Sequence, residues 1–340
     1  MILYIGNKLS KHGNTLTSVE ILGNLLSQEM DIVSISSKQN KLLRMADMLY
    51  SIVKYRKQTR FILIDTYSTS NFYYALFSAV LAKYFNISYI PILHGGNLER
   101  RLKYSSRMSK FLFSNAYMNI APSGYLQYIF KKYGFEVEFI PNNIEIDNYI
   151  FKKRKSFRPK LLYVRAFSPI YNPSMALYVF EALLKKYEDA ELCMVGPDRD
   201  GTLKRTKELC YEMCLEDKVL FTGKLSKKEW WKLSEKYDIF INTTNFDNTP
   251  VSVMEGMALG LAVVSTNVGG IPYLLEDKKD ALLVDAKDDS MMVRKIEELI
   301  ENNKKTIDIV YEARKKVECF DWKVVKKQWM ELLREDSYDL

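Results

Sequence analysis

One segment of the sequence, residues 241–277, has residue types in an order that suits the binding of a phosphate ester. It reads INTTNFDNTPVSVMEGMALGLAVVSTNVGGIPYLLED. A buried strand is predicted to end at Asn242, and Pro250 is predicted to open a helix after two capping residues, Asn248 and Thr249. The first turn of a helix presents free backbone N–H groups and a partial positive charge, which together bind anions. The predicted diphosphate site therefore comprises Asn248, Thr249, Pro250 and Val251.

Two carboxylates flank this predicted helix start. Glu255 lies about one turn into the helix, where a carboxylate can accept hydrogen bonds from the hydroxyls of a ribose. Asp247 precedes the helix and is predicted to face a sugar. The alternative is that one acid caps the helix and the other is solvated, and the pair alone does not separate the two interpretations.

A third candidate is His94, one of two histidines in the chain. It follows the apolar run YIPIL and precedes Gly95 and Gly96, which allow a ligand to approach the backbone closely. A histidine at this position can contact a ligand bound at the end of the strand, with a purely structural histidine as the alternative.

The elements that must position these residues alternate along the chain. Before residue 150, short β-branched and aromatic runs predict buried strands, and helix-period apolar positions separate them. The predicted strands are 1–6, 61–65, 88–93, 118–122 and 137–141, and the predicted helices are 14–29, 38–57, 70–84 and 123–134. Such alternation indicates an α/β domain in which helices cover a parallel sheet.

The charged segment 151–159 interrupts this pattern and is predicted to be a linker, after which the alternation resumes. Strands are predicted at 160–165, 190–196, 218–223, 237–242, 261–266 and 281–286, with helices at 173–188, 201–215, 226–236, 250–259 and 288–303. The predicted organisation is an N-terminal domain at 1–150, a second domain at 160–318 and a terminal helical segment at 319–340. Ligands of doubly wound sheets bind beyond the carboxyl ends of the strands, so the site is expected in the cleft between the domains.

The net charge of +8 is distributed unevenly over the 340 residues. Residues 1–155 have 21 Lys and Arg against 10 Asp and Glu, whereas the remainder has 29 against 32. A basic half indicates an anionic partner, and a membrane surface, a lipid-linked acceptor or a merely solvated surface all fit it. No nucleic-acid-binding motif accompanies the charge, so no nucleic acid partner is expected.

The composition also indicates in which cellular compartment the protein is expected and whether it is expected to bind a metal. No 18-residue uncharged apolar stretch occurs, and MILYIGNKLS has the pattern of a strand and not of a signal peptide. Cys193, Cys210, Cys214 and Cys319 lack the spacing of a metal site and are predicted to be reduced thiols. We expect a cytoplasmic protein without a metal, and peripheral binding to the inner face of the membrane is left open.

The segment 241–277 resembles the signature of family-4 glycosyltransferases of the GT-B fold, E-x-x-P-x-x-x-x-E-[AG]-M-A-x-G-x-[PA]-V-V-x-[ST]-x-x-G-G-[IV]-x-E. Its PVSVMEGMALGLAVVSTNVGGIP agrees at nearly every diagnostic position, and Asp247 replaces the first glutamate, giving D-x(7)-E. PILHGGN (91–97) looks like the family's strand ending in His-Gly, whose histidine points at the donor sugar. Gly13 and Asn14 match a glycine loop under the donor. The resemblance implies two Rossmann-like domains facing across a cleft.

One motif departs from the family. Where the family has G-R-L-x-x-x-K-G, whose Arg and Lys hold the diphosphate, this chain has VRAFSPIYNP (164–173). Ala166 then falls on the arginine and Tyr171 on the lysine. We expect Arg165 to take over the phosphate contact, because a buried arginine at a strand end calls for an anion. The alternative is an arginine paired with a surface carboxylate.

The resemblance implies a retaining transfer of a sugar from a nucleoside-diphosphate sugar to a saccharide or lipid-linked acceptor, in surface polysaccharide or glycolipid assembly. In that enzyme His94 and Asp247 are the implied catalytic residues, and Gly13, Asn14, Arg165, Asn248, Thr249, Pro250, Val251 and Glu255 bind the donor. Two rivals remain: a sugar-nucleotide epimerase of the same fold, and a sugar-nucleotide-binding subunit without activity. The chain has only two histidines, which argues against an epimerase because such enzymes need acid–base residues of their own. The absence of the family's Arg/Lys pair is the reason for considering a binding subunit.

Overall fold

The computed structural model describes residues 1–10, 16–95 and 97–334. The chain divides into two units, and we describe each by itself. Unit 1 comprises Met1–Pro141 and Lys326–Leu340, and unit 2 comprises Asn142–Val325. The boundary therefore falls between Pro141 and Asn142, earlier than the domain limit at residue 150 that the sequence suggested.

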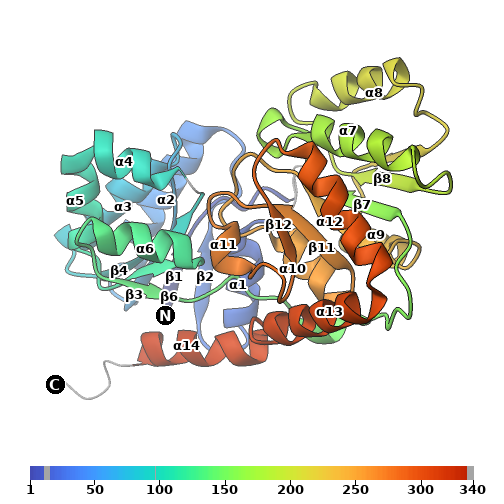
Figure 1. Cartoon of the computed structure of the whole chain (residues 1–340). Coiled ribbons are helices and arrows are strands. Elements are labelled where there is room, and N and C mark those ends of the chain that lie inside the picture. The colour runs from blue at the N-terminus through green and yellow to red at the C-terminus, as the bar shows by residue number, and fades with distance from the viewer. Residues whose placement is uncertain (11–15, 96, 335–340) are drawn as a thin grey trace. The chain divides into compact units, whose positions relative to one another are not determined.

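Unit 1 is built on a six-stranded parallel sheet (Figure 1). Its strand order is β2-β1-β3-β4-β5-β6. The strands are β1 (Ile2–Ile5), β2 (Ile32–Ile35), β3 (Phe61–Tyr67), β4 (Ser88–His94), β5 (Asn119–Ala121) and β6 (Val137–Phe139). The helices are α1 (Ser18–Leu26), α2 (Lys41–Tyr55), α3 (Phe72–Tyr84), α4 (Leu98–Tyr104), α5 (Ser106–Ser114) and α6 (Gly124–Lys132).

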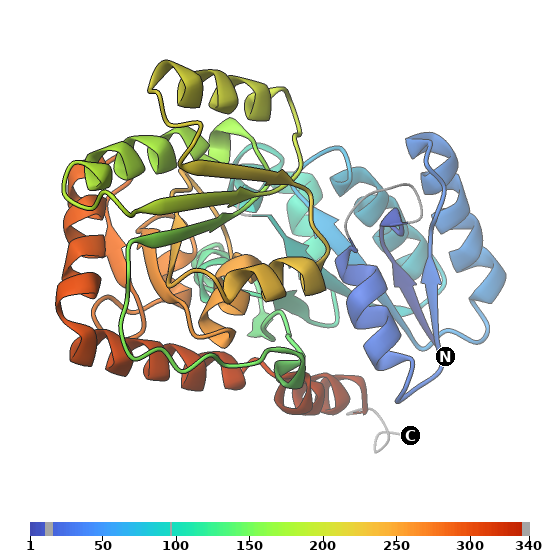
Figure 2. The ribbon, with the colours of Figure 1, turned by 90° about the vertical axis from the view of Figure 1, so that its right-hand side faces the viewer.

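Unit 2 contains a second six-stranded parallel sheet, in the order β12-β11-β10-β7-β8-β9. The strands are β7 (Lys160–Val164), β8 (Glu191–Val195), β9 (Val219–Gly223), β10 (Ile239–Asn242), β11 (Ala262–Thr266) and β12 (Leu282–Val284). The helices are α7 (Pro173–Leu184), α8 (Thr202–Glu212), α9 (Lys227–Ser234), α10 (Val251–Ala258), α11 (Ile271–Leu274), α12 (Asp289–Glu301) and α13 (Asn303–Glu318). Figure 2 shows helices above and below the strands β7, β8 and β9.

The strands of unit 2 are apolar on both sides because each side faces a separate core. Leu161 and Tyr163 of β7 join one buried cluster with α7 and α12, whereas Leu162 between them joins the cluster that contains α10. Side chains alternate across a strand, so a sheet covered on both faces favours apolar residues at successive positions. This preference explains the uninterrupted apolar runs in the sequence.

The strands predicted from those runs are confirmed in both units. The sequence did not predict β2, a four-residue edge strand whose residues are all half-buried. It also did not predict α11 or the highly charged α13, whose buried positions Thr306, Ile309, Val310, Ala313 and Val317 nevertheless follow a helical period. The basic residues Arg100, Arg101, Lys103, Arg107 and Lys110 lie on two further helices, α4 and α5, which meet at Ser105.

The segment 151–159, predicted to be a linker, is instead packed into unit 2. Arg154 is 8% exposed, and its guanidinium donates to Asp238 Oδ1 at 3.1 Å and to the carbonyls of Tyr237 and Gly260 at 2.7 and 2.6 Å. Burial lowers the pKa of Arg154, and the Asp238 carboxylate opposes that shift. The charged composition of the segment reflects a buried ion pair rather than a solvated connection.

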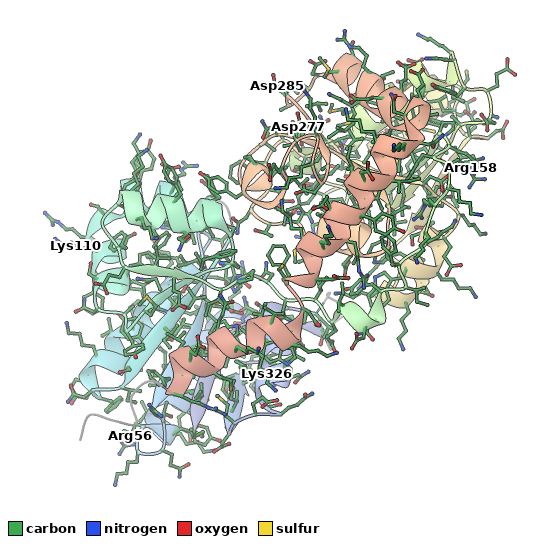
Figure 3. All side chains as sticks on the ribbon, turned by 60° about the horizontal axis from the view of Figure 1, so that its bottom comes forward. Arg56, Lys110, Arg158, Asp277, Asp285 and Lys326 are labelled. Carbon is green, nitrogen blue, oxygen red and sulfur yellow. The ribbon has the colours of Figure 1, made fainter. Side chains whose placement is uncertain are left out.

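The final helix, α14 (Trp322–Arg334), spans the boundary between the two units. Within unit 1, Lys326 Nζ lies 2.7 Å from Glu29 Oε1, and Figure 3 labels Lys326 on this helix. In unit 2, Trp322 N donates to the Ile144 carbonyl at 2.8 Å. Among the described residues, no helix has the length and apolarity that crossing a bilayer requires.

Candidate functional site

The strand order of unit 2 brings two predicted site residues together. β7 pairs with both β8 and β10, so the chain reverses its direction of winding between β7 and β10. Ligands of doubly wound sheets bind at the carboxyl ends of the strands at this switch point. Arg165 directly follows β7, and Asp247 lies in the loop that follows β10.

Arg165 and Asp247 form an ion pair at this edge of the sheet. Their side chains are 19% and 11% exposed, respectively. The guanidinium carbon of Arg165 also lies 4.3 Å from the ring centroid of Tyr171, the residue that aligns with the family's lysine. A cation over an aromatic face is attracted by the ring, so Tyr171 helps to fix the position of the guanidinium.

The partner of Arg165 is therefore another predicted site residue and not a carboxylate on the outer surface. Its Nε is buried without a hydrogen-bond partner, although the side chain has an ion pair at its other nitrogen. An unsatisfied buried donor costs free energy, and a ligand acceptor would recover that cost. The contact of Arg165 with a diphosphate stays a prediction.

The start of α10 differs in detail from the expected helix start. The helix runs from Val251 to Ala258 with Pro250 at the N-cap position, and no side chain caps it. The prediction that Asn248 and Thr249 cap the helix is thus wrong. The physical reason is that Pro250 keeps an extended ψ of 110°, which delays the first helical residue to Val251 and leaves both candidate caps too far back.

Two polar atoms near this helix start have no partner. Thr249 Oγ1 and Asn245 Oδ1 are buried and make no hydrogen bond. Since buried polar atoms are normally satisfied, these two atoms and Arg165 Nε are available to a further polar partner.

Gly269 and Gly270 hold the Asp247 loop in place. A Cβ at Gly270 would lie 1.8 Å from the Asn248 carbonyl oxygen, and one at Gly269 would lie 2.3 Å from that of Asp247. Gly270 N donates to the Asp247 carbonyl at 2.8 Å. The glycine pair of the sequence motif is therefore required for close backbone contact, which positions Asp247.

Glu255 is buried inside unit 2 and already has two partners. Its side chain is 5% exposed, and its Oε1 accepts from the Tyr149 hydroxyl at 2.8 Å and lies 2.7 Å from Lys227 Nζ. Burial and the neighbouring carboxylate raise the pKa of Tyr149. Sequence reasoning missed both partners, because they come from segments 106 and 28 residues earlier with no motif of their own. The ribose contact of Glu255 stays a prediction.

In unit 1, His94 ends β4 beside a buried aspartate that the sequence analysis did not single out. His94 Nε2 lies 2.8 Å from Asp65 Oδ1, and the side chains are 12% and 0% exposed. The same oxygen accepts from the Tyr4 hydroxyl at 2.9 Å, and the ring of Tyr67 stacks on His94 with centroids 5.0 Å apart. This carboxylate fixes the ring's orientation, with the proton on Nε2 and Nδ1 left for other partners.

The sequence offers one signal for Asp65: it is the one charged residue in the apolar run FILID, and a carboxylate is rarely buried unless it is paired. Its Oδ2 is buried without a partner. Burial and the charge of Asp65 together raise the pKa of Tyr4, Tyr67 and Tyr74 well above the ordinary value for tyrosine. The predicted residues Gly13 and Asn14 lie outside the described residues.

Residues 145–316, half of the chain, match the family described as glycosyl transferases group 1. The chain belongs to this family. The matched region contains Arg165, Asp247 and Glu255 but not His94.

Curated members of the glycosyltransferase class match over part of their length. An uncharacterized glycosyltransferase of Haemophilus influenzae is 26% identical over 158 residues, which is 46% of this chain and 44% of that protein. A putative colanic acid biosynthesis glycosyltransferase, WcaL of Salmonella typhimurium, is 28% identical over 38% of this chain and 34% of that protein. The chain thus matches less than half the length of these two relatives.

Solved glycosyltransferase structures share the fold over nearly the whole chain. Sucrose-phosphate synthase from Thermosynechococcus elongatus superposes with a TM-score of 0.79 at 14% identity and covers 98% of each chain. HepE from Anabaena, in complex with UDP and glucose, gives 0.75 at 17% identity over 98% of this chain and 99% of that one. The α/β fold with two doubly wound parallel sheets, GT-B, is confirmed.

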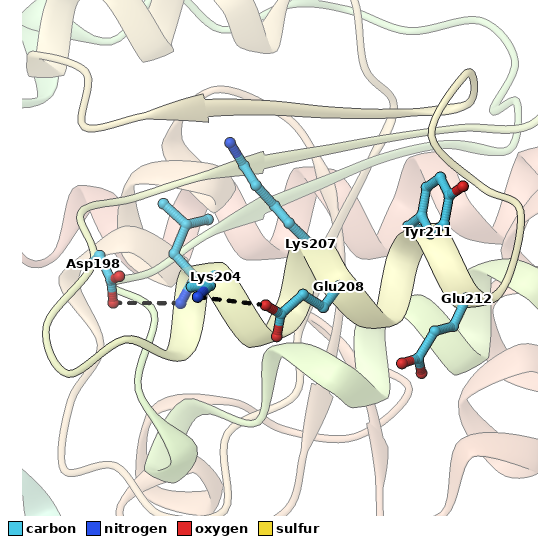
Figure 4. A pocket seen from close by; sticks show the side chains of 7 residues that line it. Asp198, Lys204, Lys207, Glu208, Tyr211 and Glu212 are labelled. Carbon is cyan, nitrogen blue, oxygen red and sulfur yellow. Dashed lines mark hydrogen bonds and ion pairs between the residues drawn. The ribbon is translucent and has the colours of Figure 1, made fainter.

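A hollow in this group 1 glycosyltransferase lies elsewhere on unit 2, along α8. It encloses about 670 Å³ and is lined by Asp198, Leu203, Lys204, Lys207, Glu208, Tyr211 and Glu212 (Figure 4). Lys204 and Glu208 pair with each other at 3.8 Å, and Asp198 Oδ1 accepts from the amides of Gly201 and Leu203. These contacts of Lys204, Glu208 and Asp198 stabilise α8 and the turn that precedes it.

Metal binding is not indicated by side-chain clustering. In residues 1–10, 16–95 and 97–334, no group of three His, Cys, Asp or Glu side chains could hold a metal ion. Asp198 and Asp200, the acids of the sequence D-R-D, cap the turn before α8, and a hydrogen bond from Thr202 lowers the pKa of Asp200. The four cysteines are free thiols.

Proposed function

We propose that this protein transfers a sugar from a nucleoside-diphosphate sugar to an acceptor hydroxyl, with retention at the anomeric carbon. The observation that carries the proposal is the convergence of Arg165 and Asp247 at the uncapped start of α10. In the reaction the bond from the anomeric carbon to the diphosphate breaks, and a bond to the acceptor oxygen forms. The leaving diphosphate gains negative charge as that bond breaks.

The residues of unit 2 would share this task as follows. Backbone amides at the start of α10 and the guanidinium of Arg165 stabilise the charge that develops on the diphosphate. Glu255 accepts hydrogen bonds from the ribose hydroxyls. Uridine diphosphate is the first ligand to test, because HepE, a structural neighbour of low sequence identity, was solved with UDP.

Donor binding would change the partner of Arg165. The guanidinium pairs with Asp247, and a diphosphate would offer it a more highly charged acceptor of the same two-point geometry. Once released, the Asp247 carboxylate is free to accept hydrogen bonds from hydroxyls of the donor sugar. A single exchange would thus couple the binding of the phosphates to the orientation of the sugar.

In unit 1, His94 is proposed to contact the donor sugar through Nδ1, because Asp65 occupies Nε2. The names of relatives in colanic acid and amylovoran biosynthesis support a role in surface polysaccharide or glycolipid assembly. The acceptor is accordingly proposed to be a saccharide or a lipid-linked saccharide, and the location to be cytoplasmic.

Calorimetry with UDP, GDP and ADP, followed by release of nucleotide from the matching sugar donor, tests this function. Asp247→Asn should bind the diphosphate at least as tightly as the parent, because Arg165 loses its competing partner, while nucleotide release from the donor falls at least tenfold. Asp285→Asn, an exposed aspartate after β12 that Figure 3 labels, is the matched control and should change neither quantity.

The outcomes separate the proposal from its rivals. Failure of all three diphosphates to bind would remove the donor site. Binding of the donor without hydrolysis, and without transfer to any acceptor, would identify a binding subunit. The observation that favours this second candidate is that Arg165 is already paired with Asp247. Conversion of the free sugar nucleotide without an acceptor would identify an epimerase.

A further inference from the structure

Helix α3 of unit 1 is apolar on the side that faces solvent. Its sequence is FYYALFSAVLAKY, and Lys83 is its one charged residue. One side packs into the core of unit 1 through Phe72, Ala75, Ala79 and Ala82, among others. The opposite side exposes Tyr73, Phe77, Val80 and Tyr84 by 40%, 44%, 44% and 77%. We name these four residues the α3 stripe.

The α3 stripe is not what a surface helix of a soluble domain ordinarily presents. Such a helix buries one apolar face and turns charged and polar residues outward, whereas a helix that is apolar all round belongs in a core or against lipid. The four positions follow spacings of 4, 3 and 4, so they form one continuous line along the helix. Continuous apolar lines on a surface mark a site of interaction.

The neighbouring helices also expose apolar and tyrosine side chains. α3 packs against α2 and against α5, as Figure 1 shows. On α2, Tyr50 and Val53 are 65% and 37% exposed, and on α5, Met108 is 36% exposed. Tyr104 at the end of α4 is 72% exposed. Apolar and tyrosine side chains are therefore exposed on four consecutive helices of unit 1.

The sequence around the α3 stripe is predominantly basic. Between residues 66 and 135 the sequence has a single acid, Glu99, against eight Lys and Arg. Unit 1 as a whole has 20 Lys and Arg against 12 Asp and Glu, so it accounts for the entire net charge of +8, and unit 2 is balanced. A partner of this surface is consequently anionic.

Several of these cations lie against the rings that border the stripe. The charged groups of Arg56, Lys83 and Arg101 lie 5.7, 5.7 and 5.5 Å from the ring centroids of Phe85, Phe111 and Tyr73. Arg56 and Lys110 point outward from the ribbon in Figure 3. Arg101 differs, because it donates to the carbonyls of Ser68 and Thr69 at 2.7 and 3.3 Å, so it holds α4 to the loop before α3.

We propose that the α3 stripe and the cations near it, which include Arg56, Lys83 and Lys110, form a docking surface for an anionic lipid bilayer. Tyrosine suits the boundary between headgroups and acyl chains, where the ring is buried and the hydroxyl stays hydrated. Phe77 and Val80 supply the apolar contact, and the cations meet the lipid phosphates. Helix α3 has 13 residues and is too short to span a bilayer, so it lies on the surface.

The choice of lipid over other anionic partners rests on the composition of this surface. A nucleic acid is bound by cations and stacking rings, and it gains nothing from aliphatic Val80 at the centre of the stripe. An acidic protein would equally need an apolar face to match the stripe, which a bilayer supplies without a specific partner. The inference does not depend on the proposed sugar transfer, because it concerns unit 1 and is measured by binding.

Sedimentation of the full chain with vesicles tests the docking surface. Vesicles of phosphatidylcholine with about one third phosphatidylglycerol are compared with vesicles of phosphatidylcholine alone. The stripe variant carries Tyr73→Ser, Phe77→Ser and Tyr84→Ser. The matched control carries Tyr178→Ser, Tyr211→Ser and Tyr311→Ser in unit 2, at side chains that are 44%, 71% and 41% exposed.

The parent and the matched control should bind the anionic vesicles equally, and the stripe variant should bind at least tenfold more weakly. A second variant, Lys54→Gln with Lys103→Gln and Lys110→Gln, should lose roughly fivefold per lysine, since each basic residue near such a surface contributes about that factor. Added salt should weaken the binding of the parent. Thermal melting shows whether each variant is folded.

Three results would overturn the inference. Equal binding of the parent to neutral and anionic vesicles removes the role of charge. Equal binding by the folded stripe variant and the parent removes the role of α3. Binding to a short RNA that competes with vesicles, and that the stripe substitutions leave unchanged, identifies a polyanion surface in place of a lipid surface.

Discussion

Arg165, at the end of β7, forms an ion pair with Asp247, which lies 82 residues later in the loop after β10. The two strands are neighbours at the point where the winding of the unit 2 sheet reverses. The cation that is predicted to bind phosphate and the acid that is predicted to face the sugar are thus partners in the structure.

Arg165→Lys should retain the charge but lose the two-point contact with a phosphate, and Arg165→Ala should lose both. We expect affinity for the nucleoside diphosphate to fall roughly tenfold to a hundredfold in Arg165→Ala, with a smaller fall in Arg165→Lys. Affinity for the nucleoside alone should change little, because it lacks the phosphates. Calorimetry with both ligands measures the difference. Unchanged binding of the diphosphate by Arg165→Ala would make Arg165 a structural partner of Asp247.

Glu255→Gln should weaken binding of the nucleoside itself on the order of tenfold to a hundredfold, because an amide is a poorer acceptor for ribose hydroxyls. Its effect on stability should be small: the Tyr149 hydroxyl keeps an acceptor, and Lys227, which is 49% exposed, can be solvated. Glu312→Gln on the exposed face of α13 is the control. A large fall in melting temperature with unchanged nucleoside affinity would show that Glu255 is a core residue only.

Asp65→Asn should release the imidazole of His94. In the parent, Asp65 Oδ1 accepts from His94 Nε2 and from Tyr4, which favours the Nε2–H tautomer. The variant should show a mixed tautomer in nitrogen NMR spectra, and its free energy of unfolding should fall by about 1–3 kcal/mol. His12 is the one other histidine of the sequence, so the signals are readily assigned. An unchanged tautomer would mean that Asp65 does not orient His94.

Gly270→Ala should displace the Asp247 loop, because the new Cβ would lie 1.8 Å from the Asn248 carbonyl oxygen. We expect a lower melting temperature and at least tenfold weaker binding of a nucleoside diphosphate. Gly201→Ala serves as the control: its φ of +80° makes alanine unfavourable by roughly 1–2 kcal/mol, but nothing lies within 4 Å of the new Cβ. If the two variants lose stability alike and bind the nucleotide alike, the close contact at Gly270 has no role in the site.

Removal of divalent metal should leave activity unchanged. In the proposed function, the backbone amides at the start of α10 and the guanidinium of Arg165 would supply the positive field that a metal would otherwise provide. Release of nucleotide from the sugar donor should therefore be equal before and after dialysis against EDTA. Loss of activity that Mg²⁺ or Mn²⁺ restores would contradict this expectation.

Much of the fold follows from local patterns in the sequence. Runs such as FILID and LAVVST have the length and composition of strands buried on both faces, and this pattern depends only on neighbouring residues. Strands at the edge of a sheet are harder to predict. The four residues of β2 are all half-buried, so its sequence lacks the clear apolar pattern of a buried strand. The segment around Arg154 was misjudged because charge ordinarily indicates solvent, and only the position of Asp238, 84 residues away, shows that the arginine is buried.

The sequence by itself determined the α/β class, the motif around Glu255 and the candidate residues, because helix starts, glycine pairs and apolar runs are local features. The tertiary structure alone decided the partners of those residues: Asp247 for Arg165, Lys227 and Tyr149 for Glu255, and Asp65 for His94. Each of these contacts joins segments that the order of strands or the packing of helices brings together. Ion pairs and hydrogen bonds act over a few ångströms in space, and separation along the chain does not reveal which groups lie that close.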